Sequence, residues 1–69
     1  MRNVLYALGN TRDARHVAVI EARLDDVAPI TRGAAIWALK QILDEPGFAR
    51  LRASRAEREL DPEVQSEWT

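Results

Sequence analysis

The segment from Ile30 to Leu43, ITRGAAIWALKQIL, constrains the fold more than any other part of the chain. Apolar residues lie on nearly every side of the helix that its pattern predicts, and a helix of this kind must be buried on more than one face. In a chain of 69 residues, only neighbouring helices can cover it. Pro29 suits the first turn, where the backbone N–H has no intrahelical partner. The segment is therefore predicted to be the central helix of a stacked helical array.

Residues 2–8 have the pattern of a short helix, which Gly9 and Asn10 are expected to end with a left-handed cap. This helix has no N-cap and no partner helix before it. We therefore expect the chain to be a fragment of a longer protein, in which the face of Leu5 and Leu8 has lost its cover. Such a fragment is expected to be a monomer or a weak dimer of marginal stability, because at least three repeats are normally needed.

A further helix is predicted over residues 14–24, between the first helix and the central one. Asp13 is a suitable N-cap for it, and its apolar residues share one side (Val17, Ile20 and Leu24). The turn over residues 25–28 then enters the central helix with Ala28 at the capping position, so this N-terminus is under-capped. We expect one of the two aspartates of the turn to compensate by pairing with Arg32.

The last predicted helix covers residues 47–60, after a break at Asp44-Glu45-Pro46-Gly47. It carries a thin apolar stripe (Ala49, Ala53, Ala56 and Leu60), with Phe48 and Leu51 beside it. Arg55 and Glu59 are spaced to pair across one turn. Residues 61–69 are expected to be a C-terminal tail, in which Val64 and Trp68 can meet on one helical turn.

An internal repeat links the first helix to the central one. Residues 4–8, VLYAL, align with residues 35–39, AIWAL, at a shift of 31. One amphipathic helix lies between the two copies, so the repeating unit is a helix pair of about 30 residues. The sequence therefore predicts an all-α fold: a single domain over residues 1–69, built as a short right-handed α-solenoid of about four helices.

Charge is distributed unevenly along the chain. Residues 1–43 carry six Lys or Arg and four acids, whereas residues 44–69 carry four Arg and seven acids, which gives a net charge of −1. This distribution slightly favours a polyanion as partner. The candidate phosphate contacts lie around the first inter-helix turn and the start of the central helix: Arg2, Asn3, Asn10, Arg12, Arg15 and Arg32. A merely solvated turn explains the same residues equally well.

No catalytic or metal-binding arrangement is visible, so the chain is predicted to have no catalytic, cofactor or metal site of its own. Cysteine is absent, which excludes disulfides and thiolate or iron–sulfur ligands. His16, the only histidine, suits a surface or capping role better than metal ligation. Tyr6 and Trp37 can stack on bases, but aromatic residues at apolar helix positions are more often core. With no signal peptide and no apolar run of about 18 residues, we expect a cytoplasmic protein without membrane contact.

Two blocks of the sequence, RNVLYALGNTRD (residues 2–13) and LDDVAPITRGAAIWAL (residues 24–39), resemble the short HEAT-like repeats at the C-terminus of epoxyqueuosine reductase. The closing DPEV and EW, within residues 61–68, resemble the tail of some members. The repeat itself is shared with many HEAT-like proteins, including phycobilisome lyases. Two positions depart from the pattern: Ala28 stands where a polar residue usually opens the second helix of the repeat, and Thr31 where an apolar residue is common.

The resemblance implies a parent protein that is an oxidoreductase with 4Fe-4S clusters and cobalamin, acting in queuosine biosynthesis on tRNA. The cluster ligands of such a protein would lie upstream, so this chain would not be an enzyme by itself. The resemblance implies a HEAT-like repeat domain that helps to position tRNA beside an upstream catalytic domain. The alternative is a generic HEAT-like scaffold for protein interaction. A concave basic surface would favour the first function, and an exposed apolar patch the second.

Overall fold

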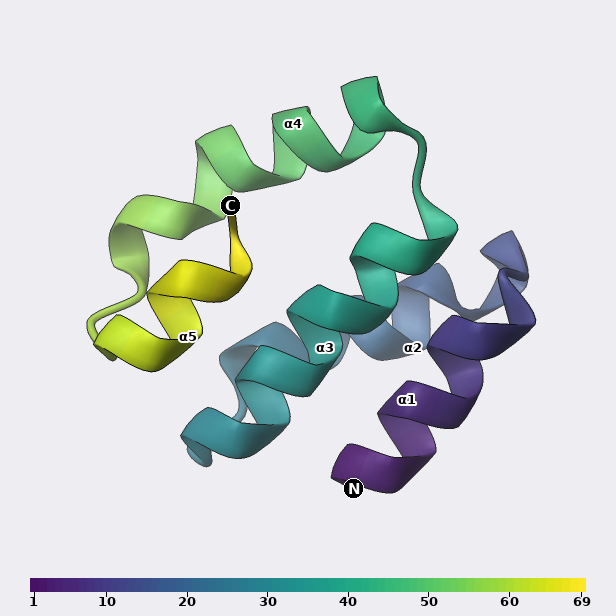
Figure 1. Ribbon diagram of the computed structural model, residues 1–69, viewed down its shortest axis with the longest axis horizontal. Coiled ribbons are helices and arrows are strands. Elements are labelled where there is room, and N and C mark those ends of the chain that lie inside the picture. Colours follow the sequence, from purple (N-terminus) through teal and green to yellow (C-terminus); the bar gives the residue numbers. More distant parts are fainter.

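The computed structural model describes all 69 residues, and it is helical outside its turns and termini (Figure 1). The prediction of an all-α fold is confirmed. The α-helices are α1 (Arg2–Thr11), α2 (Val17–Glu21), α3 (Pro29–Ile42), α4 (Glu45–Arg55) and α5 (Pro62–Glu67), and the short 3-10 helices are η1 (Ala14–His16), η2 (Ala22–Asp25) and η3 (Ala56–Arg58). There are thus five α-helices rather than about four, and none is long and apolar enough to cross a membrane.

Helix α3 lies at the centre of the fold, as the sequence predicts. It contacts α1, α2, η2 and α5, and Ala35, Ala38 and Leu39 on it are completely buried. Pro29 occupies its first turn, and Ala28 supplies no side-chain cap, as expected. Ile30 differs from the expectation of an apolar residue buried all round, because its side chain is 64% exposed at the open end of the helix.

Helices α1 and α3 lie side by side and run in the same direction, with α2 behind them (Figure 1). The predicted cap at Gly9 and Asn10 is wrong: α1 continues to Thr11, and Arg12 adopts the left-handed conformation, with φ of 53°. Gly9 serves a different purpose. A Cβ atom at this position would lie 2.8 Å from Cα of Ala38, so the glycine permits the close approach of the two helices.

Leu5 is 1% exposed, so the expectation that its face lacks cover is wrong for this residue. The segment after α1 is also less regular than predicted, because η1, α2 and η2 together replace one continuous helix. Asp13 does cap this segment, accepting a hydrogen bond from the backbone N–H of Arg15 at 2.9 Å. Ile20 and Leu24 are buried, which confirms the predicted apolar side.

Helix α4 begins two residues earlier than predicted and ends at Arg55. The side chain of Asp44 caps it by accepting a hydrogen bond from the N–H of Gly47 at 2.8 Å. The predicted apolar stripe is correct only at Ala56, which packs against the core. Ala49 and Ala53 are exposed, and Leu60 is 91% exposed beyond the helix. The buried anchor is Phe48, whose ring centroid lies 5.6 Å from that of Trp68.

The segment predicted as a tail contains helix α5, which packs against α3. Asp61 caps this helix by accepting hydrogen bonds from the N–H groups of Glu63 and Val64 at 2.9 and 3.3 Å. Val64 and Trp68 are 4% and 3% exposed, so both belong to the core. Gln65 ties α5 to the preceding segment, because its amide donates to the backbone oxygens of two residues there (Ala56 and Glu59).

Candidate functional site

Four of the predicted RNA-contact residues lie on the exposed side or at the ends of α1, and we call them the α1 edge: Arg2, Asn3, Asn10 and Arg12. None of their side chains forms a hydrogen bond or ion pair within the chain. Helix α1 contains no acidic residue. The two arginines stand at opposite ends of a helix about 15 Å long, so they are placed for an extended polyanion rather than a single anion.

Arg15 is exposed, but its charge is matched locally. Its Nε and Nη2 groups donate to Oδ2 of Asp13 at 3.0 and 2.6 Å. This hydrogen bonding, with the backbone N–H of Arg15 as a second donor, lowers the pKa of the Asp13 carboxyl. Arg15 therefore adds little uncompensated positive charge to the surface beside α1.

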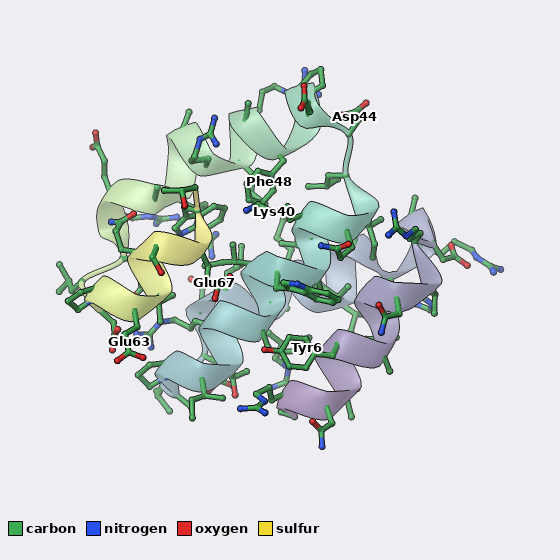
Figure 2. All side chains as sticks on the ribbon, viewed as in Figure 1. Tyr6, Lys40, Asp44, Phe48, Glu63 and Glu67 are labelled. Atoms are coloured by element: carbon green, nitrogen blue, oxygen red, sulfur yellow. The ribbon has the colours of Figure 1, made fainter.

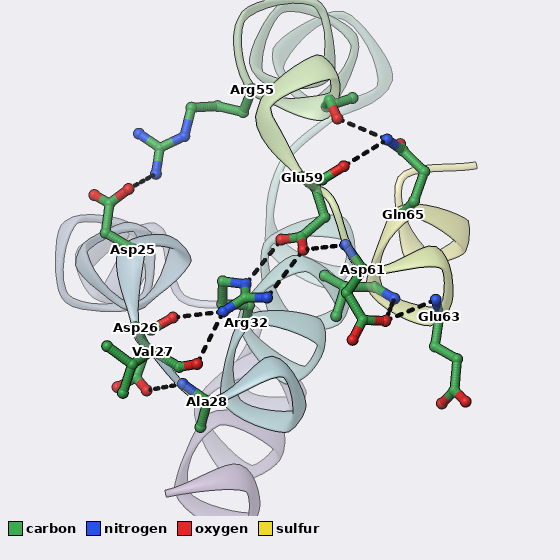
Figure 3. A network of polar contacts seen from close by, with 12 residues as sticks. Asp25, Asp26, Val27, Ala28, Arg32, Arg55, Glu59, Asp61, Glu63 and Gln65 are labelled. Atoms are coloured by element: carbon green, nitrogen blue, oxygen red, sulfur yellow. Dashed lines mark hydrogen bonds and ion pairs between the residues drawn. The ribbon is translucent and has the colours of Figure 1, made fainter.

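Arg32 lies apart from the α1 edge, in a network of polar contacts at the start of α3 (Figure 3). Its Nε and Nη2 groups donate to the two carboxylate oxygens of Glu59 at 2.8 and 3.0 Å. Its Nη1 group donates to the backbone oxygens of Asp26 and Val27 at 2.9 and 3.1 Å. The Arg32 side chain is 19% exposed and that of Glu59 9%, so this guanidinium is mostly buried and joins α3 to the segment before α5.

The contact with Arg32 is the first cause of the lowered pKa of Glu59; the backbone N–H of Asp61 lowers it further, while burial opposes both. The sequence predicted that an aspartate of the turn would pair with Arg32, and that Glu59 would pair with Arg55. Both predictions are wrong, because Glu59 pairs with Arg32. Arg55 instead donates to Asp25 at 2.9 Å. These pairs join residues 27 and 30 positions apart, beyond the reach of any helix-spacing rule.

Tyr6 and Trp37 form an edge-to-face pair, with ring centroids 5.0 Å apart and planes at 86°. Both are half-buried between α1 and α3, so the preference for a core role is partly confirmed and part of each residue stays exposed. Figure 2 shows Tyr6 on one side of α3 and Glu63 and Glu67 of α5 on the other. These residues and Gly33 line a groove of about 180 Å³.

Lys40, near the end of α3, is directed toward α4 and the last residues of the chain (Figure 2). Its Nζ lies 5.6 Å from the centre of the Phe48 ring and donates to the backbone oxygen of Thr69 at 3.1 Å. His16 is half-buried, and the structure brings together no group of three or more metal-ligating side chains. None of these positions adds to the candidate RNA surface.

A cleft of about 390 Å³ opens between the turn after η2 and the segment that contains η3. This cleft was not predicted from the sequence. Val27 and Leu60 line this cleft and are 94% and 91% exposed. Large aliphatic side chains in two polar turns were the available signal, but only the tertiary structure brings them to one cleft.

The chain matches no protein-family model, no curated protein and no solved structure in the comparisons made.

Proposed function

We propose that this chain is a HEAT-like helical-repeat module of an epoxyqueuosine reductase-like protein, which helps to seat tRNA and is not itself catalytic. The repeat blocks in residues 2–13 and 24–39 suggest the family, and the α1 edge supplies the contact surface. The catalytic groups of the parent, its 4Fe-4S clusters and cobalamin, would belong to an upstream domain.

The arrangement of equivalent residues supports a solenoid of helix pairs. In such an array each repeat packs against the next, so equivalent side chains become neighbours. Tyr6 and Trp37 are equivalent at the shift of 31, and their rings are in contact. Trp68 follows after another 31 residues, at the end of α5, which is a further helix packed against α3.

The observation that carries the RNA proposal is the unpaired charge of Arg2 and Arg12 on a helix without acids. Guanidinium and amide groups of this kind contact phosphate oxygens and position a nucleic acid without reading its bases. Arg15 and Arg32 leave the proposed contact set, because Asp13 and Glu59 already bind their guanidinium groups. The proposed surface is therefore the α1 edge alone.

The test is a titration of the chain with tRNA at about 50 and about 200 mM salt, followed by mapping of amide chemical shifts. Two phosphate-binding arginines predict a dissociation constant near 10⁻⁴ M at moderate salt and about tenfold weakening between the two conditions. Arg2→Ala and Arg12→Ala should each reduce the salt slope by about one. Arg50→Ala is the matched control, because Arg50 is exposed on α4 and likewise unpaired. Absence of binding at low salt, or shifts confined to residues 44–69, would refute the proposal.

A protein-interaction module remains the second candidate, and one observation favours it. Val27 and Leu60 expose nearly all of their aliphatic surface beside a single cleft. Apolar surface grouped in this way marks interaction sites more often than isolated exposed residues do.

A further inference from the structure

We propose that the cleft between the η2–α3 turn and the η3 segment, here called the η3 cleft, docks a segment of a partner protein that carries a carboxylate next to an apolar side chain. The inference rests on the protein-interaction candidate above and is independent of the RNA contact at the α1 edge. It is carried by three properties of the cleft: its apolar surface, its unmatched charge and its fixed walls.

The apolar surface of the η3 cleft is continuous with the core. Leu24, Ile36 and Trp68 contribute to its lining and are at most 8% exposed, whereas Val27 and Leu60 stand almost fully in solvent. Single exposed aliphatic residues are common on protein surfaces. Two of them lining one cleft, above buried apolar residues, form the kind of patch that an apolar side chain of a partner can cover.

The charges around the η3 cleft leave one cation without a partner. Arg32 is paired with Glu59, and Arg55 with Asp25. Arg58 also lines the cleft and is exposed, but it forms no ion pair or side-chain hydrogen bond. An incoming segment that brings one carboxylate beside its apolar side chain would complement this charge.

The same charges disfavour a nucleic acid as occupant. Three carboxylates and three arginines line the cleft, and each of the carboxylates is in an ion pair. The single unpaired cation, Arg58, is too little positive charge to hold a run of phosphates. A protein segment can present a single negative charge and bury apolar surface at once. A protein is therefore the class of partner that the lining fits.

The ion pairs also hold the walls of the cleft in place (Figure 3). Arg32 binds the backbone oxygen of Val27 on one wall and the carboxylate of Glu59, the neighbour of Leu60, on the other. The pair of Arg55 and Asp25 joins the same two segments. Because the walls are fixed before binding, a partner loses less free energy in ordering the site.

The experiment is an amide chemical-shift titration of the 69-residue chain with the peptide acetyl-Gly-Ser-Leu-Asp-Leu-Glu-Gly-amide. The comparison peptide has lysine in place of both acidic residues. We expect the acidic peptide to bind more tightly and to shift residues 24–27 and 58–60 and the indole of Trp68. Arg58→Ala should weaken binding about fivefold and remove the preference for the acidic peptide. The double variant Val27→Ser, Leu60→Ser should weaken it at least about tenfold.

Two control variants change exposed residues outside the cleft: Val19→Ser and Arg50→Ala should leave peptide binding unchanged. The proposal is overturned if millimolar acidic peptide shifts none of the cleft amides, or if the lysine peptide binds equally well. Shifts of these amides on adding tRNA, or on raising the protein concentration alone, would assign the cleft to RNA or to a second copy and overturn it as well. Loss of tRNA binding in Arg12→Ala, with peptide binding intact, would separate the two proposals.

Discussion

Replacing Gly9 by alanine is expected to destabilise the domain, whereas the same replacement at Gly33 is expected to stabilise it. Both glycines are buried within helices and neither has a positive φ, so their backbone conformations suit alanine equally well. They differ in the space around them. A Cβ on Gly9 would lie 2.8 Å from Cα of Ala38 and 2.9 Å from the ring of Trp37, but a Cβ on Gly33 would meet its nearest neighbour, Cγ of Glu67, at 3.8 Å.

The magnitudes follow from two opposing effects. Alanine inside a helix gains about 0.5–1 kcal/mol over glycine, because glycine loses more conformational freedom on folding. At Gly33 nothing opposes this gain, since 3.8 Å is an ordinary van der Waals separation. At Gly9 the helices must move apart, and overpacking of this kind costs about 1–3 kcal/mol. The contact is with backbone atoms of α3, which cannot rotate away, so we expect a net loss of about 1–2 kcal/mol.

Thermal and urea denaturation of the two variants, followed by circular dichroism, measure the difference directly. A change of 1 kcal/mol shifts the melting temperature of a domain of this size by about 4–8 °C, so the two variants should differ by at least about 6 °C. The Gly33→Ala variant serves as the control for helix propensity. A Gly9→Ala variant as stable as Gly33→Ala would show that the close approach of α1 and α3 does not limit the packing.

Two further predictions concern the core and its ion pair. Trp68→Ala should lower the free energy of unfolding by about 3–5 kcal/mol, because Trp68 is 3% exposed. Trp37→Ala should lower it by about half as much, because Trp37 is half-buried. Urea denaturation that gives the reverse order would contradict this prediction. Stability should also fall in acid through Glu59. Since its folded pKa is lowered, its contribution is present above the ordinary glutamate pKa of about 4.3 and is lost as the pH falls through the folded value. Glu59→Gln should flatten this acid limb of the stability profile, whereas Glu57→Gln, at an exposed residue without an ion-pair partner, should not.

The features that the sequence predicted well depend on local rules. The apolar run from Ile30 to Leu43 identified the central helix, which the structure places one residue earlier, at Pro29–Ile42. The cap at Asp13 and the burial of Ile20 and Leu24 were predictable for the same reason, because a cap or a helical face is set by residues within two turns.

The features that were missed depend on contacts between distant segments. Glycine followed by asparagine is typical of a helix end, but glycine also occurs where two helices approach each other closely. At Gly9 only the contact with Ala38, which is distant in the sequence, shows that the second reason applies. The outer face of α4 was assigned incorrectly because alanines at helical spacing suggested a buried side. Phe48, which was predicted only to lie beside the stripe, determines the buried side through its contact with Trp68.

Arg32 illustrates why charge counts along the sequence overstate the basic surface. Of the six Lys and Arg residues in the first 43, Arg15, Arg23 and Arg32 form ion pairs, and Lys40 binds the backbone at the end of the chain. Two arginines therefore remain without an ion pair or side-chain hydrogen bond, Arg2 and Arg12 of the α1 edge, and the guanidinium of Arg2 lies 5.6 Å from the centre of the Tyr6 ring. Exposed charges that are already paired contribute little to the attraction of a distant polyanion, because the field of each pair largely cancels. Any RNA contact must consequently be weak unless further repeats extend the surface, whereas the η3 cleft relies on apolar contact and needs no such extension.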